Sequence, residues 1–180
     1  MEEVRLSSTQ FEGYHLAMSL YKVTDEANTG KVQEQLQKAV AEHKDSFCII
    51  NPEFVVTVLQ VSLGVHKALH HLKNNKMRTE SLNTEILYNL HPAHTITKCL
   101  DTMGLKSIKK GFLAVIISKE GQDAPLIPDL EHVERQDIND LSDYTDVVKM
   151  KELYDIPDEV MEFERGFSSE VYSTLALKNN

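Results

Sequence analysis

Apolar side chains alternate with polar ones, or form short runs, in segments of the chain that predict β-strands. Residues 14–22 (YHLAMSLYK) alternate with the period of a half-buried strand. Residues 47–50 (FCII) form a short apolar run of strand type. Residues 112–117 (FLAVII) are the most hydrophobic stretch and predict a central strand of a sheet.

The segment 82–90 (LNTEILYNL) fits both the helical and the strand period. Ile86, Tyr88 and Leu90 alternate with the residues between them, and Pro92 closes the segment. We therefore favour a strand for these residues.

The longest helix is expected after Asn51-Pro52, which supply an N-cap and a proline for the first helical position. Its predicted buried stripe consists of apolar residues three and four apart: Phe54, Val58, Val61, Val65, Leu69 and Leu72. Gln60 is expected on the opposite, solvent-facing side.

Similar spacing predicts shorter helices over residues 31–42, 95–103, 146–154 and 169–177. Thr95 and Thr145 are the expected N-caps of the second and third, and Gly104 closes the second. Residues 123–143 are polar and should form an exposed connection with at most one more strand.

Strands mixed with helices, without strict alternation, predict an α+β fold. We expect a single domain over residues 1–180, with a mostly antiparallel central sheet and flanking helices. Charged residues make up 26% of the chain and apolar residues 41%, as in ordinary globular proteins. No apolar run approaches the roughly 18 residues that span a bilayer, and Met1-Glu2-Glu3 is unlike a signal peptide. Secretion, membrane insertion and a membrane partner are therefore not expected.

The cysteines and glycines argue against several classes of function. Cys48 and Cys99 lie far apart among apolar neighbours, which indicates buried thiols in a reducing compartment. None of the seven glycines forms a phosphate-binding loop, and there is no nucleophile elbow. The sequence carries no catalytic signature, and no cofactor is expected.

The net charge of −9, taken as a total, argues against a nucleic-acid partner. However, residues 60–112 carry eight Lys and Arg against three Asp and Glu, a net charge of +5. Residues 120–165 carry 15 acidic residues against four basic ones, a net charge of −11. Such asymmetry can mark two partner surfaces, although solvated charged loops would give the same counts. The total charge therefore does not exclude an RNA partner.

Two pairs of residues suggest enzymatic alternatives. His66 and His70 lie one helical turn apart and could share a metal ion, but no glutamate between them could act as a base. Glu85 and Asp101 could form an acid–base pair, but nothing in the sequence brings them together. We assign no catalytic residue and no bound metal. A metal-dependent enzyme and a small-molecule sensor domain stay open as alternatives.

An ordered set of short motifs lies within residues 75–105. It consists of Lys76-Met77-Arg78-Thr79, Leu82-Asn83-Thr84-Glu85-Ile86-Leu87, Asn89-Leu90-His91-Pro92, Ile96 and Met103-Gly104-Leu105. In this order the motifs resemble the small kinase-binding subunit of the KEOPS (EKC) complex, the family of PRPK-binding proteins. A looser likeness covers nearly the whole chain.

The resemblance implies a non-catalytic subunit of a complex that makes the threonylcarbamoyl modification of the adenosine next to the anticodon of tRNA. In that family the small subunit docks on an atypical kinase and ATPase of the PRPK type. That kinase in turn holds the threonylcarbamoyl transferase, so the transferase and the other KEOPS subunits are implied as indirect partners. The small subunit also helps to recruit tRNA through its single-stranded CCA end. The resemblance also implies a cytoplasmic and nuclear location.

A single-stranded CCA end requires a basic groove and surfaces on which bases stack. The positive segment offers these candidate tRNA-binding residues: Lys67, Lys73, Lys76, Arg78, Lys98, Lys109 and Lys110. Tyr88 or His94 could supply stacking, although Tyr88 fits a core position equally well. Glu80 and His91 depart from the family pattern, which often has a basic residue and a serine there.

The C-terminal helix offers candidate kinase-binding residues, Phe167, Val171 and Leu175, which form an apolar stripe with one-turn spacing. The same spacing would let these residues close the domain's own core. The sequence leaves both interpretations open.

Overall fold

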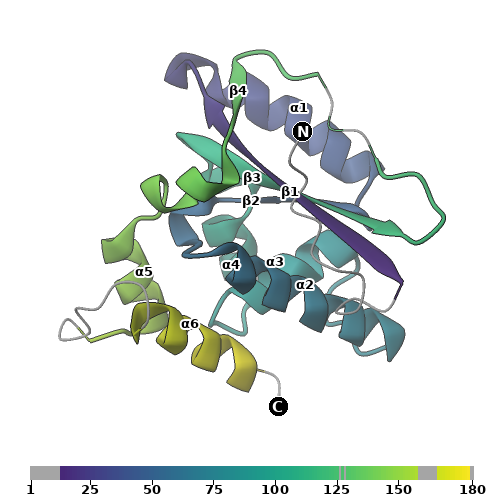
Figure 1. Ribbon diagram of the computed structural model, residues 1–180, viewed down its shortest axis with the longest axis vertical. Coiled ribbons are helices and arrows are strands. Elements are labelled where there is room, and N and C mark those ends of the chain that lie inside the picture. Colours follow the sequence, from purple (N-terminus) through teal and green to yellow (C-terminus); the bar gives the residue numbers. More distant parts are fainter. Residues whose placement is uncertain (1–12, 126, 128, 158–165, 179–180) are drawn as a thin grey trace.

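The computed structural model describes residues 13–125, 127, 129–157 and 166–178. Its strands form one antiparallel sheet in the order β2-β3-β1-β4 (Figure 1). The strands are β1 (Tyr14–Val23), β2 (Phe47–Ile50), β3 (Gly111–Lys119) and β4 (Val133–Gln136). The predicted α+β fold with an antiparallel sheet is confirmed, with β3 in the interior of the sheet and β4 in the polar connection.

Helices pack on both faces of this sheet. They are α1 (Thr29–Glu42), α2 (Val58–Lys73), α3 (Leu82–Leu90), α4 (Ile96–Met103), α5 (Val147–Tyr154) and α6 (Gly166–Leu177). In Figure 1, α1 covers one face, and the other helices lie on the opposite side of the sheet. Within the described residues, no helix combines the length and the apolar character that crossing a membrane requires.

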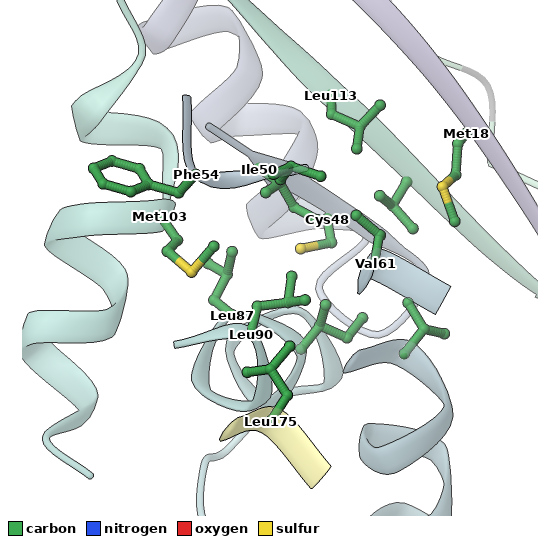
Figure 2. Close-up of a cluster of buried hydrophobic side chains, with 14 of the residues drawn as sticks. Met18, Cys48, Ile50, Phe54, Val61, Leu87, Leu90, Met103, Leu113 and Leu175 are labelled. Atoms are coloured by element: carbon green, nitrogen blue, oxygen red, sulfur yellow. The ribbon is translucent and has the colours of Figure 1, made fainter. Parts of the chain in front are cut away.

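Two apolar clusters hold the layers together. The larger one joins one face of the sheet to α2, α3, α5 and α6. In Figure 2, Leu175 of α6 and Leu90 of α3 both point into this cluster. The smaller one, which includes Leu36 and Phe112, joins α1 to the opposite face. Both cysteines are buried and free, as predicted.

Residues 82–90 form the helix α3, so the predicted strand is wrong. Nearly every side chain of α3 is buried, including those of Asn83, Glu85 and Asn89. Because a helix buried all round has no solvent face, its sequence lacks a clear helical period. The Asp45 carboxylate accepts a 3.1 Å hydrogen bond from the backbone N–H of Leu82 and thereby holds the start of the helix.

The long helix α2 begins at Val58, and not after Asn51 as predicted. Asn51 instead caps a short 3₁₀ helix, η3 (Pro52–Phe54), through a hydrogen bond from the backbone N–H of Glu53. The chain is then extended, and the Thr57 hydroxyl caps α2. The proline and its N-cap therefore belong to a separate short element.

Gln60 is fully buried, and its predicted position facing solvent is wrong. Its side-chain oxygen accepts from the backbone N–H of Val56 at 2.8 Å, and its amide donates to the carbonyl of Phe54 at 3.1 Å. The glutamine thus satisfies polar backbone groups of the extended segment before α2, which explains a polar side chain in the core. At the other end of the helix, Leu72 is partly exposed rather than part of a buried stripe.

Two helix ends also differ in detail from the prediction. Asp146, and not Thr145, caps α5, because its carboxylate accepts from the backbone N–H of Lys149 at 3.1 Å. Gly104 follows α4 as predicted, but its φ of −90° is open to any residue. A Cβ there would lie 2.5 Å from the carbonyl oxygen of Leu100, so close packing requires the glycine.

Candidate nucleic-acid interface

The family-like motifs fold into one unit around the buried helix α3. The α2–α3 loop (residues 74–81) carries Lys76 and Arg78, and the α3–α4 turn (residues 91–95) carries His94. All three of these side chains are exposed. Because α3 packs against both α2 and α4, it positions the loop and the turn together.

Glu85 of α3 is the centre of this unit, and its side chain is fully buried. Its Oε2 accepts hydrogen bonds from the backbone N–H groups of Arg78 at 2.9 Å and Thr79 at 3.0 Å, and from the Thr79 hydroxyl at 2.9 Å. Its Oε1 lies 2.7 Å from Nδ1 of His71 on α2. The carboxylate therefore fixes the α2–α3 loop from inside. The place of Glu85 in the motif was the only sequence signal for this role.

Tyr88, on the same helix, links the loop to the turn. Burial raises the pKa of its hydroxyl, and the Arg78 guanidinium opposes this rise through its charge and a hydrogen bond. The Tyr88 hydroxyl also lies 3.5 Å from Nδ1 of His94. Because Tyr88 is only 1% exposed, it offers no free ring face for base stacking, whereas His94 is exposed.

His91, at the start of the turn, is a buried and neutral imidazole. Its Nδ1 accepts from the backbone N–H of Ala93 at 2.9 Å, and its Nε2 is buried without a hydrogen-bond partner in the described part of the chain. Burial and the charges of Lys178 and Lys98 lower the pKa of His91 to about 4. At neutral pH His91 therefore adds no positive charge to this turn, and the exposed charge that acts on it is that of Lys98 on α4.

The predicted tRNA-binding residues fall into two groups. The first group is exposed on the α2–α3 loop, at the end of α2 and on α4, and we call it the basic surface: Lys73, Lys76, Arg78 and Lys98. The charge of Arg78 acts on Tyr88 of α3, and the charge of Lys98 acts on His91 of the α3–α4 turn. The basic surface therefore lies next to the motif unit.

The other predicted tRNA-binding residues lie in different surroundings. Lys67 is half-buried, and its ammonium donates to the carbonyl oxygens of Leu175 at 2.5 Å and Lys178 at 2.7 Å. Lys109 and Lys110 lie directly before β3. Lys110 lines a cavity of about 260 Å³ together with acidic side chains, which weakens its attraction for phosphate.

The predicted kinase-binding residues lie in the core. Phe167, Val171 and Leu175 are 1%, 0% and 0% exposed and belong to the larger apolar cluster. Figure 2 shows Leu175 pointing inward. Of the two interpretations of this stripe, the structure therefore favours closure of the protein's own core.

The outer side of α6 still offers exposed apolar groups beside α2. Leu177 is 72% exposed, and Leu59, at the start of α2, is 54% exposed. The hydroxyls of Thr57 and Tyr172 lie 2.5 Å apart, and Lys67 contacts the end of α6, so the two helices lie side by side. We call the adjoining outer sides of these two helices, with Leu59 on α2 and with Tyr172 and Leu177 on α6, the α2–α6 face.

The sequence-based metal and acid–base alternatives gain no support from the geometry. Among the residues that the structure describes, no group of three or more His, Cys, Asp or Glu side chains could hold a metal ion. His66 and His70 are exposed on α2. Glu85 is engaged with the α2–α3 loop, and Asp101 is exposed on α4.

Comparison with known proteins gives one family and several relatives. The family model of the kinase binding protein CGI-121 matches residues 20–179. The chain is 28% identical over 148 residues to the EKC/KEOPS complex subunit TPRKB of Danio rerio, covering 81% of each chain. It is 31% identical over 105 residues to the EKC/KEOPS complex subunit CGI121 of Debaryomyces hansenii, covering 58% of this chain and 51% of the relative. The corresponding subunit of Kluyveromyces lactis is 25% identical over 116 residues, covering 64% of this chain and 69% of the relative.

Proposed function

Because the chain belongs to the family of the kinase binding protein CGI-121, we propose that it is a subunit of a KEOPS (EKC) complex. The names of its relatives support membership in the complex, and the family description supports kinase binding. Its direct partner is an atypical kinase of the PRPK type, and its second ligand is tRNA. The protein acts as a non-catalytic adaptor in the cytoplasm and nucleus, where it presents tRNA for threonylcarbamoylation of the adenosine next to the anticodon.

The observation that carries the RNA part of this proposal is the anchoring of the α2–α3 loop by Glu85. A buried carboxylate holds the backbone of Arg78 and Thr79, while the side chains of Lys76 and Arg78 stay exposed. A loop fixed in this way presents its positive charges to phosphates without first having to be ordered. Together with the exposed imidazole of His94, it supplies the charge and the stacking surface that single-stranded RNA requires.

For the kinase, the α2–α6 face is the proposed docking surface. Leu59 and Leu177 are large apolar side chains exposed to solvent. Such side chains contribute strongly to the free energy of binding when a partner buries them. The buried stripe of Phe167, Val171 and Leu175 supports this face from inside by holding α6 on the core.

Reversing two charges of the basic surface is expected to weaken tRNA binding strongly. In a chain with Lys76→Glu and Arg78→Glu, we expect affinity for tRNA to fall at least about tenfold at 0.1 M salt. The slope of log K against log salt should fall in magnitude by about 1.4, because each contact to a single-stranded phosphate accounts for about 0.7. Filter binding or fluorescence anisotropy at several salt concentrations measures both quantities.

The matched control reverses Lys31 and Lys38, two exposed lysines of α1 on the other side of the sheet. The control gives the chain the same net charge but should leave the salt slope unchanged. Equal loss in both variants would mean that only total charge matters and would contradict the proposed surface. A tRNA without its CCA end that binds as tightly as the intact tRNA would contradict the single-strand mechanism.

A further inference from the structure

The last described residue, Lys178, is buried although it follows the end of α6. Its side chain is 5% exposed, and its ammonium lies 3.7 Å from the centre of the Tyr88 ring. The ammonium donates to the carbonyl oxygens of Tyr88, of His91 at 2.6 Å and of Ala93 at 2.7 Å. All three N–H donors of the ammonium therefore have acceptors, and the aromatic face adds a cation–π contact.

These acceptors belong to the end of α3 and to the α3–α4 turn. The carbonyls of His91 and Ala93 lie in a turn that makes no ladder or helix of its own. Without the Lys178 ammonium, the His91 carbonyl would need another partner, and the Ala93 carbonyl would keep only the weak 3.5 Å bond from the Cys99 thiol. Water can replace the ammonium only if the turn opens. One side chain from the C-terminal helix thus holds a turn that is more than 80 residues away in the sequence.

Lys178 is itself held in place from α2. The Lys67 ammonium donates to the backbone carbonyls of Leu175 and Lys178, at the carbonyl end of α6, which favours a positive charge. Burial lowers the pKa of Lys178 to about 8, so the side chain still carries its proton at neutral pH. Lys67 therefore holds the backbone at the end of α6, and the Lys178 side chain holds the α3–α4 turn.

The α3–α4 turn and Tyr88 also determine the surroundings of two exposed side chains, those of Arg78 and His94. The ring that Lys178 covers belongs to Tyr88, and the charge of the Arg78 guanidinium acts on the hydroxyl of that ring. The same hydroxyl lies 3.5 Å from the ring of His94. A shift of Tyr88 or of the turn would therefore change the surroundings of both Arg78 and His94.

We propose that Lys178 is a positioning residue for RNA binding, through which the C-terminal helix holds the α3–α4 turn, Arg78 and His94 in their RNA-binding arrangement. The role rests on the proposed function of the basic surface. Lys178 contacts no RNA itself, because its ammonium is buried and all of its donors are used within the protein. Its effect is therefore on geometry and not on phosphate contacts.

The test is tRNA binding by Lys178→Met as a function of salt. We expect the affinity for tRNA to fall about tenfold, an effect of the size that is typical when two parts of a protein are coupled. The slope of log K against log salt should stay unchanged. Lys38→Met on α1 removes the same charge from an exposed position and should bind as the unsubstituted chain does. Unchanged affinity of a folded Lys178→Met chain would overturn the proposal. A slope smaller in magnitude by about 0.7 would also overturn it, since that result indicates a direct phosphate contact.

A second variant keeps the proposal testable if Lys178→Met does not fold. Lys67→Met loosens the same link from the α2 side at a half-buried position and should give the same pattern, a lower affinity at an unchanged slope. Wild-type affinity in that variant would overturn the proposal. If the unsubstituted chain does not bind tRNA, the proposed RNA function fails and the role of Lys178 fails with it. If the unsubstituted chain binds and both variants bind equally well, only the role of Lys178 fails.

Discussion

Replacing Glu85 with alanine is expected to lower the free energy of unfolding by about 3 kcal/mol and to weaken tRNA binding about tenfold. The substitution leaves the backbone N–H groups of Arg78 and Thr79, and His71, without their buried acceptor, whereas the Thr79 hydroxyl can still donate to the Ser81 carbonyl. The α2–α3 loop then has to be ordered at the moment of binding, which costs affinity. Chemical denaturation measures the stability, and hydrogen exchange at Arg78 and Thr79 measures the order of the loop.

The direction of the change in tRNA affinity distinguishes the anchoring role of Glu85 from a simple effect of charge. Simple electrostatics predicts tighter binding, because the substitution removes a negative charge from the protein. The exposed Glu80, in the same loop, is the matched control: Glu80→Ala removes the same charge and should leave stability unchanged and binding equal or slightly tighter. Glu85→Gln keeps an acceptor oxygen, so its stability and its affinity for tRNA should lie between those of Glu85→Ala and Glu80→Ala. Tighter tRNA binding by Glu85→Ala would contradict the anchoring role.

The stability of the protein is expected to fall as the pH is lowered from about 6.5 to about 4, with His91 contributing about 3 kcal/mol of that loss. The folded state lowers the pKa of His91 to about 4, whereas the unfolded chain has the ordinary value of about 6.5. Between these values the unfolded state binds the proton and the folded state does not. The contribution is therefore complete above pH 6.5 and is lost as the pH falls toward 4. Denaturation at several pH values measures it.

Other groups titrate in this range, so the informative quantity is a difference between variants. His91→Asn keeps an acceptor for the backbone N–H of Ala93 but does not titrate there. The stability difference between the unsubstituted chain and His91→Asn should change with pH by about 3 kcal/mol. A difference for His91→Asn that stays constant from pH 7 to pH 4 would show that the imidazole is not buried as described.

The elements that the sequence predicted correctly are those whose neighbours impose a clear period. β1 has one face in the larger core and alternates accordingly, and β3 is buried on both faces and is continuously apolar. α3 was missed because it is buried all round, so no solvent face marks its period. Gln60 was misplaced because its amide serves the backbone of an interrupted segment, which a helical pattern does not reveal.

The sequence also predicted part of the candidate site, namely the residues whose role depends on their own charge and not on distant contacts. The exposed lysine and arginine on the α2–α3 loop, Lys76 and Arg78, follow from charge counting and from the family-like motif. The roles of Glu85 and Lys178 depend on contacts with distant or loop residues, and a lone glutamate or lysine in a sequence indicates solvent exposure. The stripe of Phe167, Val171 and Leu175 has a spacing that suits a docking helix and a core helix equally, and only the packing distinguishes them.

The central claim is that this chain is a kinase-binding adaptor, and calorimetric titration with a purified PRPK-type kinase tests it most directly. We predict a one-to-one complex with a Kd of about 1 μM or tighter. Leu177→Arg on the α2–α6 face should weaken it at least about tenfold, since a charge would replace an apolar contact. Val148→Arg, at a similarly exposed apolar position on α5, should leave it unchanged. No detectable complex between the two folded proteins at concentrations of about 50 μM would contradict the claim.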